Sequence, residues 1–293
     1  MIVPLVIAHR GASGYRPENT IAAFRLGLDM QADGIEFDLV TTKDEKLIVR
    51  HENTLSSTTD IASIPVLKSA KREGRVENKV VQDWFTEDLN LSDLAHVKAI
   101  ERLGELRPGS AKFDSQFDIP TFQELLHDEQ IRHHLVVAEL KVGSHLTKLS
   151  RPVWEIFVDD LMAAPLAGNL VVESFDLEIL RATKRALQQK QIQARYFFLL
   201  EEGAVADHLI HIREFDGIAI SIEMLFADLS WVEKTHQLSK QIWVYTARAK
   251  QAETSIEEYY LRIIDSGVDG IFADQPDLLR RVLADSRGSA YDY

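Results

Sequence analysis

Short apolar runs alternate with longer amphipathic segments along most of this chain. The runs are rich in Val, Ile, Leu and Phe, whereas Thr20–Ala32 places Ile21, Phe24 and Leu28 on one face of a helix. This alternation is typical of parallel strands joined by crossover helices, and eight such strands close an α/β TIM barrel. The expected strands are Ile2–Ala8, Gly34–Val40, Leu135–Leu140, Leu170–Ser174, Ala194–Leu200, Gly217–Ser221, Gln241–Tyr245 and Gly270–Phe272.

One apolar run breaks the alternation. Lys46–His51 follows the strand Gly34–Val40 after only the short polar stretch TTKDE. A connection this short cannot lead to a parallel neighbour, so the pattern predicts an antiparallel hairpin and an extra strand beside the barrel. If the turn centres near Asp44, the numbers of facing residues add up to about 88, which places His51 roughly opposite Phe37.

The segment 53–118 is polar and interrupted, and it fits neither pattern. We expect it to be an insertion or small subdomain over one barrel face, within a single TIM-barrel domain that spans residues 1–293. Leu91–Leu103 is expected to be helical. Trp84 and Phe85 are interpreted as part of the insertion's own core, with a lip that grips lipid as the alternative.

Composition narrows the expected partners. Acidic residues outnumber basic ones, 46 to 33, which gives a formal net charge of -13. Such a field repels nucleic acid and anionic membranes, although one local cation would suffice to hold a small anionic substrate. The chain has no cysteine, so disulfides and thiolate metal sites are excluded. No apolar run approaches the roughly 20 residues of a transmembrane helix. We therefore expect a cytoplasmic protein, and no feature predicts its oligomeric state.

Two carboxylates interrupt the apolar pattern of the second strand. In GIEFDLV, Glu36 and Asp38 share one face, while Ile35, Phe37 and Leu39 share the other and would pack against helices. The carboxylates would then point into the barrel, where burying two like charges is costly unless a cation compensates them.

The third strand repeats this arrangement, because Glu139 and Lys141 of VVAELKV share a face. Three carboxylates without any thiolate suit one hard divalent cation, Mg²⁺ or Ca²⁺, with Mn²⁺ as an alternative. Lys141 would then hold an anion beside that cation. His51 returns across the hairpin to the level of Glu36 and Asp38, so a histidine, the carboxylates and a metal ion are expected to converge.

Each of these features alone has a simpler explanation. An E-x-D pair is more often a solvated strand edge, and an E-x-K pair is commonly an ordinary ion pair. A lone histidine such as His9 or His51 is more often a hydrogen-bonded surface residue. All of them, however, fall near the ends of neighbouring predicted strands, which is the catalytic face of a TIM barrel. The coincidence favours a functional site.

Nine short motifs follow one another along nearly the whole chain outside the insertion. They are HRG (His9–Gly11), PENT (Pro17–Thr20), E-x-D (Glu36 and Asp38), TTKDEKLIVRHENTL (Thr41–Leu55), IPTFQELL (Ile119–Leu126), AELK (Ala138–Lys141), ESF (Glu173–Phe175), WVYT (Trp243–Thr246) and GIFADQPDLL (Gly270–Leu279). In order and spacing they resemble the glycerophosphodiester phosphodiesterase family. No single motif is decisive, but the series is specific.

The resemblance implies a metal-dependent TIM-barrel phosphodiesterase that hydrolyses glycerophosphodiesters to sn-glycerol 3-phosphate and an alcohol. It implies that Glu36, Asp38 and Glu139 bind the metal ion, and that His9 and His51 are the acid and base. Histidines suit that role because they titrate near neutral pH.

The same resemblance implies that Arg10, Lys141 and Trp243 bind the phosphate or the rest of the substrate. Glu18 would support His9 or Arg10 from behind. Asn19 is assigned to the same supporting layer, although it or Thr20 also fits the N-cap of the first helix.

The chain departs from the family pattern in two places near the site. The family usually has aspartate where this chain has Glu52, which affects the geometry around His51. It usually has asparagine where this chain has Thr246, which alters a polar contact near the substrate.

Three other functions fit parts of the pattern. Lysophospholipase D activity on acylated substrates would need an apolar groove or surface. A barrel that binds phosphodiesters or metal without catalysis would be expected to lack one of the named histidines or ligands, and this chain has them all. A sugar-processing barrel would use Glu36 and Glu139 but would leave the histidines and basic residues without a role.

Overall fold

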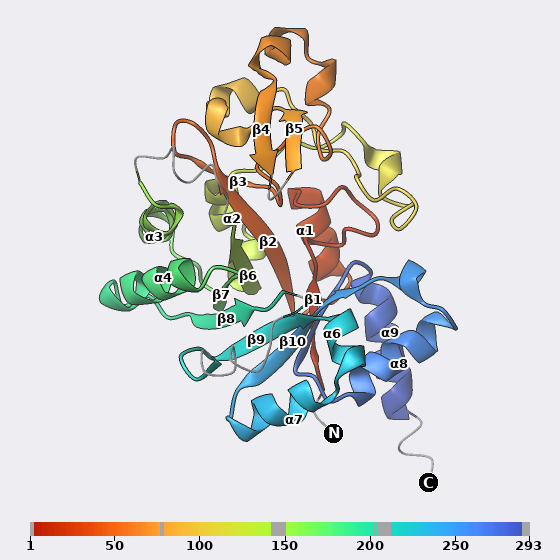
Figure 1. The fold of residues 1–293 in the computed structure, drawn as a ribbon. Helices are drawn as coiled ribbons and strands as arrows, with labels where there is room; N and C mark the ends of the chain where they lie inside the picture. Colours follow the sequence, from red (N-terminus) through yellow and green to blue (C-terminus); the bar gives the residue numbers. More distant parts are fainter. Residues whose placement is uncertain (1–2, 77–78, 142–150, 202, 204–211, 289–293) are drawn as a thin grey trace.

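A computed structural model of the chain describes residues 3–76, 79–141, 151–201, 203 and 212–288 (Figure 1). Within these residues, eight parallel strands close into a barrel because β1 pairs with β2 on one side and with β11 on the other. The predicted TIM barrel is therefore confirmed. The barrel strands are β1 (Leu5–Ala8), β2 (Gly34–Thr41), β6 (Leu135–Leu140), β7 (Leu170–Ser174), β8 (Arg195–Leu199), β9 (Gly217–Ser221), β10 (Gln241–Ala247) and β11 (Gly270–Ala273).

The predicted strands differ from the observed ones only at their ends. The first strand begins at Leu5, and the expected start at Ile2 lies outside the described residues. Strand β10 continues two residues past Tyr245, to Ala247. This extension matters because it carries Thr246 to the mouth of the barrel, where the strands end.

Helices surround the barrel and bury the outward faces of its strands (Figure 1). Ile35, Phe37 and Leu39 of β2 belong to this outer core, as their alternation predicts. The Phe37 ring packs between Phe24 and Phe122, with ring centroids 6.1 and 5.8 Å away. The helices are α1 (Ile21–Asp29), α2 (Phe122–His127), α3 (Val153–Ala163), α4 (Leu177–Gln189), α6 (Ile222–Ala227), α7 (Ser230–Gln237), α8 (Ile256–Asp265) and α9 (Pro276–Gly288).

A second apolar cluster fills the inside of the barrel. Trp243 lies at its centre, fully buried, with its ring 4.3 Å from that of Phe197 and 5.7 Å from that of Phe272. A Cβ atom on Gly270 would lie 2.8 Å from the indole, so this close approach requires glycine there. The packed interior closes the barrel from below and leaves only its upper end open to a ligand.

The predicted hairpin is confirmed together with its register. Strand β3 (Leu47–Val49) runs antiparallel to β2, and Leu39 pairs with Val49 while Thr41 pairs with Leu47. The numbers in each pair add up to 88, as the turn near Asp44 requires. His51 therefore follows β3 by two residues and returns toward the carboxylates of β2.

The segment 53–118 packs over the end of this hairpin and carries a separate two-stranded sheet, β4 (Arg72–Val76) with β5 (Lys79–Asp83) (Figure 1). Trp84 and Phe85 are buried, which favours the core interpretation over a lipid-gripping lip. Trp84 belongs to an apolar cluster that combines segment residues with two from the hairpin and with Ile119, just after the segment. Its other members are Val40, Ile48, Leu55, Ile61, Leu67, Leu89, Leu94 and Val97.

The prediction of a helix over Leu91–Leu103 was wrong. A short 3-10 helix spans Leu91–Leu94, a turn follows, and Lys98 and Ala99 then form isolated β-bridges. The backbone N–H of Ala99 donates to Phe117, and that of Ile100 donates to Thr58. These long-range bonds take the donors that a helix would have used inside itself. In the described part of the chain, no helix has the length and apolar character needed to cross a bilayer.

Thr20, not Asn19, caps the first helix. Its hydroxyl accepts a hydrogen bond from the N–H of Ala23 at 3.1 Å. Thr20→Val keeps the shape of the side chain but removes this acceptor, so we expect the free energy of unfolding to fall by about 1 kcal/mol. Urea unfolding measures the change, and an unaltered midpoint would show that the cap contributes nothing.

Candidate functional site

A cavity of about 260 Å³ lies at the carboxyl ends of the barrel strands, where the loops following them meet. Most of the predicted site residues face it. The predicted residues among its lining are His9, Arg10, Glu36, His51, Glu139 and Lys141. The opposite wall is formed mainly by β7, β9 and β10 and the residues that follow them, and it includes Phe175, Ser221, Glu223, Tyr245 and Thr246.

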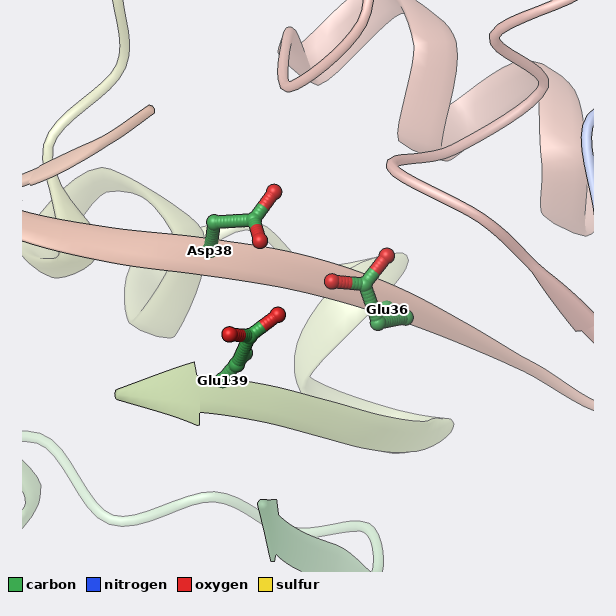
Figure 2. Close-up of side chains that lie close together, drawn as sticks. All are labelled: Glu36, Asp38 and Glu139. Atoms are coloured by element: carbon green, nitrogen blue, oxygen red, sulfur yellow. The ribbon is translucent and has the colours of Figure 1, made fainter. Parts of the chain in front are cut away.

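Three carboxylates meet at the base of the cavity. Glu36 and Asp38 come from β2 and Glu139 comes from β6, where Glu139 pairs in register with Asp38. Their side chains point toward one another (Figure 2), and one oxygen of each lies within 4.8 Å of the others. All three are buried. The alternation seen in the sequence therefore builds a group of three carboxylates that could hold a metal ion.

The protein's own cations compensate this cluster only in part. Burial, together with the negative charge of Asp38, raises the pKa of Glu36 well above its ordinary value. Burial also raises the pKa of Glu139, to about 7, against the opposing effect of Lys141. The pKa of Asp38 is instead held low, because Arg10 and Lys141 outweigh the effect of burial.

A fourth carboxylate adds to the imbalance. Glu173 of β7 pairs in register with Glu139, and its Oε2 is buried without a hydrogen-bond partner. The cavity base thus has four carboxylates against the two cations of Arg10 and Lys141. A bound divalent cation would supply the two missing positive charges, and the all-oxygen ligands suit a hard ion.

Arg10 is fixed by carboxylates on several sides. Its backbone N–H donates to Glu36 at 2.8 Å, and its guanidinium contacts Glu18 at 2.9 Å and Asp38 at 3.0 Å. Lys141 contacts Asp38 at 3.0 Å and Glu139 at 2.6 Å. An ammonium has three donors and a guanidinium has five, so both side chains retain N–H groups for an anion in the cavity.

His9 is held by a carboxylate that the sequence analysis did not assign. Its Nδ1 lies 2.8 Å from Asp274, which follows β11. Burial and the nearby charge of Arg10 lower the pKa of His9 to about 3, so the ring is neutral at pH 7. The pKa of Asp274 is also low, because Arg107 and His9 outweigh burial, and its ionised carboxylate only accepts. Nδ1 therefore carries the proton, and Nε2 is free to accept one.

His51 has the same arrangement on the other side of the cavity. Its Nδ1 lies 2.7 Å from Glu52, and burial with the charges of Arg10 and Lys141 lowers the pKa of His51 to about 4. The longer acidic side chain at position 52 still reaches the ring. Both imidazoles thus have Nδ1 occupied by a carboxylate, and Nε2 is the nitrogen left for chemistry.

The two supporting residues lie where they can act on the site. Glu18 contacts Arg10 rather than His9. Asn19 exchanges hydrogen bonds with Asp38, donating from Nδ2 at 2.8 Å and accepting from the backbone N–H at 3.3 Å. Asn19 therefore orients one of the three clustered carboxylates instead of capping the helix.

The predicted substrate contact by Trp243 does not match its position. Trp243 is completely buried in the barrel interior and does not line the cavity, whereas Tyr245, two residues later, does. Thr246, where the family usually has asparagine, also lines the cavity, and its hydroxyl is 3.4 Å from Nε2 of His9. Of the motif WVYT, only the last two residues, Tyr245 and Thr246, line the cavity.

Five site residues received no role from the sequence. Three of them, Arg102, Arg107 and Arg248, lie in loops, where no period or spacing marks a charged side chain. Asp274 and Glu173 lay inside quoted motifs, and that was the available signal. These residues are Arg102, Arg107, Glu173, Arg248 and Asp274.

Comparisons with known proteins agree with the motifs. The profile of the "Glycerophosphoryl diester phosphodiesterase family" matches residues 9–278. A glycerophosphodiester phosphodiesterase of Caldanaerobacter subterraneus is 28% identical, over 94% of this chain and 96% of its own length. One of Bacillus subtilis is 27% identical, over 95% of this chain and 86% of its own length.

Solved structures share the fold. A putative glycerophosphoryl diester phosphodiesterase from Silicibacter pomeroyi has a TM-score of 0.74 at 22% identity, covering 98% of this chain and 95% of that one. A phosphodiesterase from Oleispira antarctica, solved in complex with its product sn-glycerol-3-phosphate, has a TM-score of 0.71 at 22% identity and covers 96% of this chain and 97% of its own. At such identities the likeness is one of fold.

Proposed function

This chain belongs to the glycerophosphoryl diester phosphodiesterase family, and we propose that it hydrolyses glycerophosphodiesters to sn-glycerol 3-phosphate and an alcohol. We assign the proton transfers to His9 and His51 and the binding of one divalent cation to Glu36, Asp38 and Glu139. One observation carries the proposal: two neutral imidazoles, each held through Nδ1, line the same small cavity as two of these carboxylates.

The two histidines divide the proton transfers between them. A hydroxyl, from water or from the glycerol part of the substrate, attacks phosphorus while the Nε2 of one histidine takes its proton. The bond from phosphorus to the leaving alcohol breaks, and the other histidine donates a proton to that oxygen. Where the glycerol hydroxyl attacks, this step forms a cyclic glycerophosphate, and a water molecule opens the ring in a second step in which the two histidines exchange roles. A phosphodiester anion between the rings raises the pKa of both, which allows one of them to enter the reaction protonated.

Arg10 and Lys141 supply the remaining donors to the phosphate. Both line the cavity, and their contacts with Glu18, Asp38 and Glu139 hold their charges in place before substrate arrives. Such preorganised charges stabilise the transition state without rearrangement during the reaction. The divalent cation, when bound, adds positive charge beside the phosphoryl oxygens.

A lysophospholipid substrate has less support. Five large apolar side chains are strongly exposed in the described part of the chain: Val3, Val66, Val80, Met162 and Leu229. They come from separate places in the sequence, and none of them lines the cavity. These five side chains therefore form no apolar path from the cavity for an acyl chain.

The test measures release of sn-glycerol 3-phosphate from glycerophosphodiesters with different head groups and from a lysophospholipid. The protein is assayed first with EDTA and then with Mg²⁺, Ca²⁺ or Mn²⁺ restored, and Glu139→Gln serves as the metal-site variant. Metal-restored turnover of the deacylated diesters supports the proposal. Turnover that is unchanged by EDTA would contradict the proposed metal dependence. Activity confined to the lysophospholipid would contradict the proposed substrate class.

Metal affinity is expected to rise with pH between about 6 and 8. The pKa of Glu139 is about 7, so this carboxyl group carries a proton over part of that range and a cation must displace it. Raising the pH removes this proton beforehand and favours binding, by up to about 10-fold per pH unit for each proton released. Calorimetric titration with Mg²⁺ or Mn²⁺ in buffers of different ionisation enthalpy counts the protons. An affinity that does not change with pH would contradict the expectation.

A further inference from the structure

The carboxylate partners of both histidines are themselves held by arginines from segment 53–118. Arg107 binds Asp274 with two nitrogens, Nε at 2.7 Å and Nη2 at 3.1 Å. Arg102 binds Glu52 through Nη1 at 2.8 Å. The two-point contact of Arg107 fixes the orientation of the Asp274 carboxylate as well as its position.

The two arginines meet on a single residue, Glu18. Arg102 contacts its Oε1 at 3.0 Å, and Arg107 contacts its Oε2. Glu18 is almost completely buried, and it also accepts from Arg10 at 2.9 Å. One carboxylate thus joins both histidine partners and a cavity arginine.

These contacts form an unbroken chain of hydrogen bonds across the site. It runs from His9 through Asp274, Arg107, Glu18, Arg102 and Glu52 to His51. The members come from five places in the chain: after β1, before α1, after β3, from segment 53–118 and after β11. Neither imidazole ring can reorient without breaking its Nδ1 hydrogen bond to a carboxylate, and each carboxylate is itself held by an arginine.

A purely structural role explains this arrangement less well. The segment is already attached to the barrel by its apolar cluster with Val40 and Ile48. Replacing a buried ion pair by apolar groups is often neutral for stability or better, so stability alone is a weak reason for burying Arg107 and Glu18. The two arginines reach the very carboxylates that contact the histidines.

We propose that Arg102 and Arg107 are positioning residues that set the two histidines through Glu52 and Asp274, so that segment 53–118 completes the catalytic site. This inference rests on the proposed roles of His9 and His51. The two arginines touch no reacting atom, so their removal is expected to lower kcat while KM and metal affinity stay within about 2-fold of the wild type.

The test uses Arg102, because Arg107 is fully buried and its loss would leave Asp274 and Glu18 without their shared cation. Arg102→Met is expected to lower kcat by about 10- to 100-fold, the usual range for loss of an outer partner that orients a site residue. Arg102→Lys, which retains the positive charge and can restore one of the two contacts, should recover part of the loss. Arg72→Met is the matched control, because Arg72 also forms ion pairs within the segment, with Glu87 and Asp88, but has no contact with the chain of hydrogen bonds.

A double-mutant cycle with Glu52→Gln separates positioning from general damage. If Arg102 acts mainly through Glu52, adding Arg102→Met to Glu52→Gln should cost less than about 3-fold further. An equal loss in both backgrounds, an equal loss in Arg72→Met, or a normal kcat in folded Arg102→Met would each overturn the inference.

His51→Ala is measured alongside, because it separates the proposed catalytic role of His51 from the proposed positioning role of Arg102. An inactive His51→Ala with a normal Arg102→Met leaves the proposed function standing and removes the positioning role. An active His51→Ala removes both. Thermal unfolding of every variant ensures that kcat refers to folded protein.

Discussion

Replacing His9 with alanine is expected to lower kcat by about 10²- to 10⁴-fold, the range for loss of a general acid or base. The same loss is expected for His51→Ala, because both rings have Nδ1 bound to a carboxylate and both line the cavity. Neither ring lies in the apolar clusters that hold the barrel together, so the fold should survive both changes. Steady-state kinetics with a glycerophosphodiester, combined with thermal unfolding, measures both properties.

His236→Ala is the matched control for these two variants. His236 also contacts a carboxylate, Asp269 at 2.9 Å, but it does not line the cavity. Its replacement should leave kcat unchanged within about 2-fold. A nearly normal rate in His9→Ala or His51→Ala would remove that histidine from the mechanism.

Replacing Arg50 with methionine is expected to lower the free energy of unfolding by about 3 kcal/mol or more. Arg50 is buried, and its guanidinium donates to the carbonyls of Val49, Thr58, Glu18 and Asn19 at 2.7 to 3.1 Å. Methionine fills the space but leaves several buried acceptors without a donor, at about 1 kcal/mol or more for each. Burial lowers the pKa of Arg50 only to about 10, so the cation persists at neutral pH.

The loss should also reach the active site. Two of the four carbonyls belong to Glu18 and Asn19, whose side chains hold Arg10 and Asp38. Urea unfolding and kcat are therefore measured on the same sample. Arg25→Met is the control, because its side chain is 56% exposed and its ion pair with Asp128 should contribute no more than about 1 kcal/mol. Equal stability losses in the two variants would contradict the role given to Arg50.

The local pattern of apolar and polar residues was sufficient to predict the barrel, its extra strand and about half of the site residues. The period of two in β2 and β6 separates outward apolar residues from inward carboxylates, and that period is a property of the backbone alone. The short TTKDE connection likewise left only a hairpin, so the register of Leu39 with Val49 followed from chain length. The motifs around His9, Glu36 and His51 identified the family, and residues 9–278 match its profile.

What only the tertiary structure decided involves residues far apart in the chain. Arg107 meets Asp274 across 167 positions and Glu18 across 89, and no period or spacing in the sequence marks such pairs. Trp243 lies beneath the cavity because the barrel closes around it, and the expected helix over Leu91–Leu103 gave way to hydrogen bonds with Thr58 and Phe117. The barrel strands follow from the pattern of neighbours within a few residues, whereas the stretch Leu91–Leu103 depends on partners far along the chain. The partners of buried charges follow from which loops the closed barrel brings together, and that is settled only when the whole chain has folded.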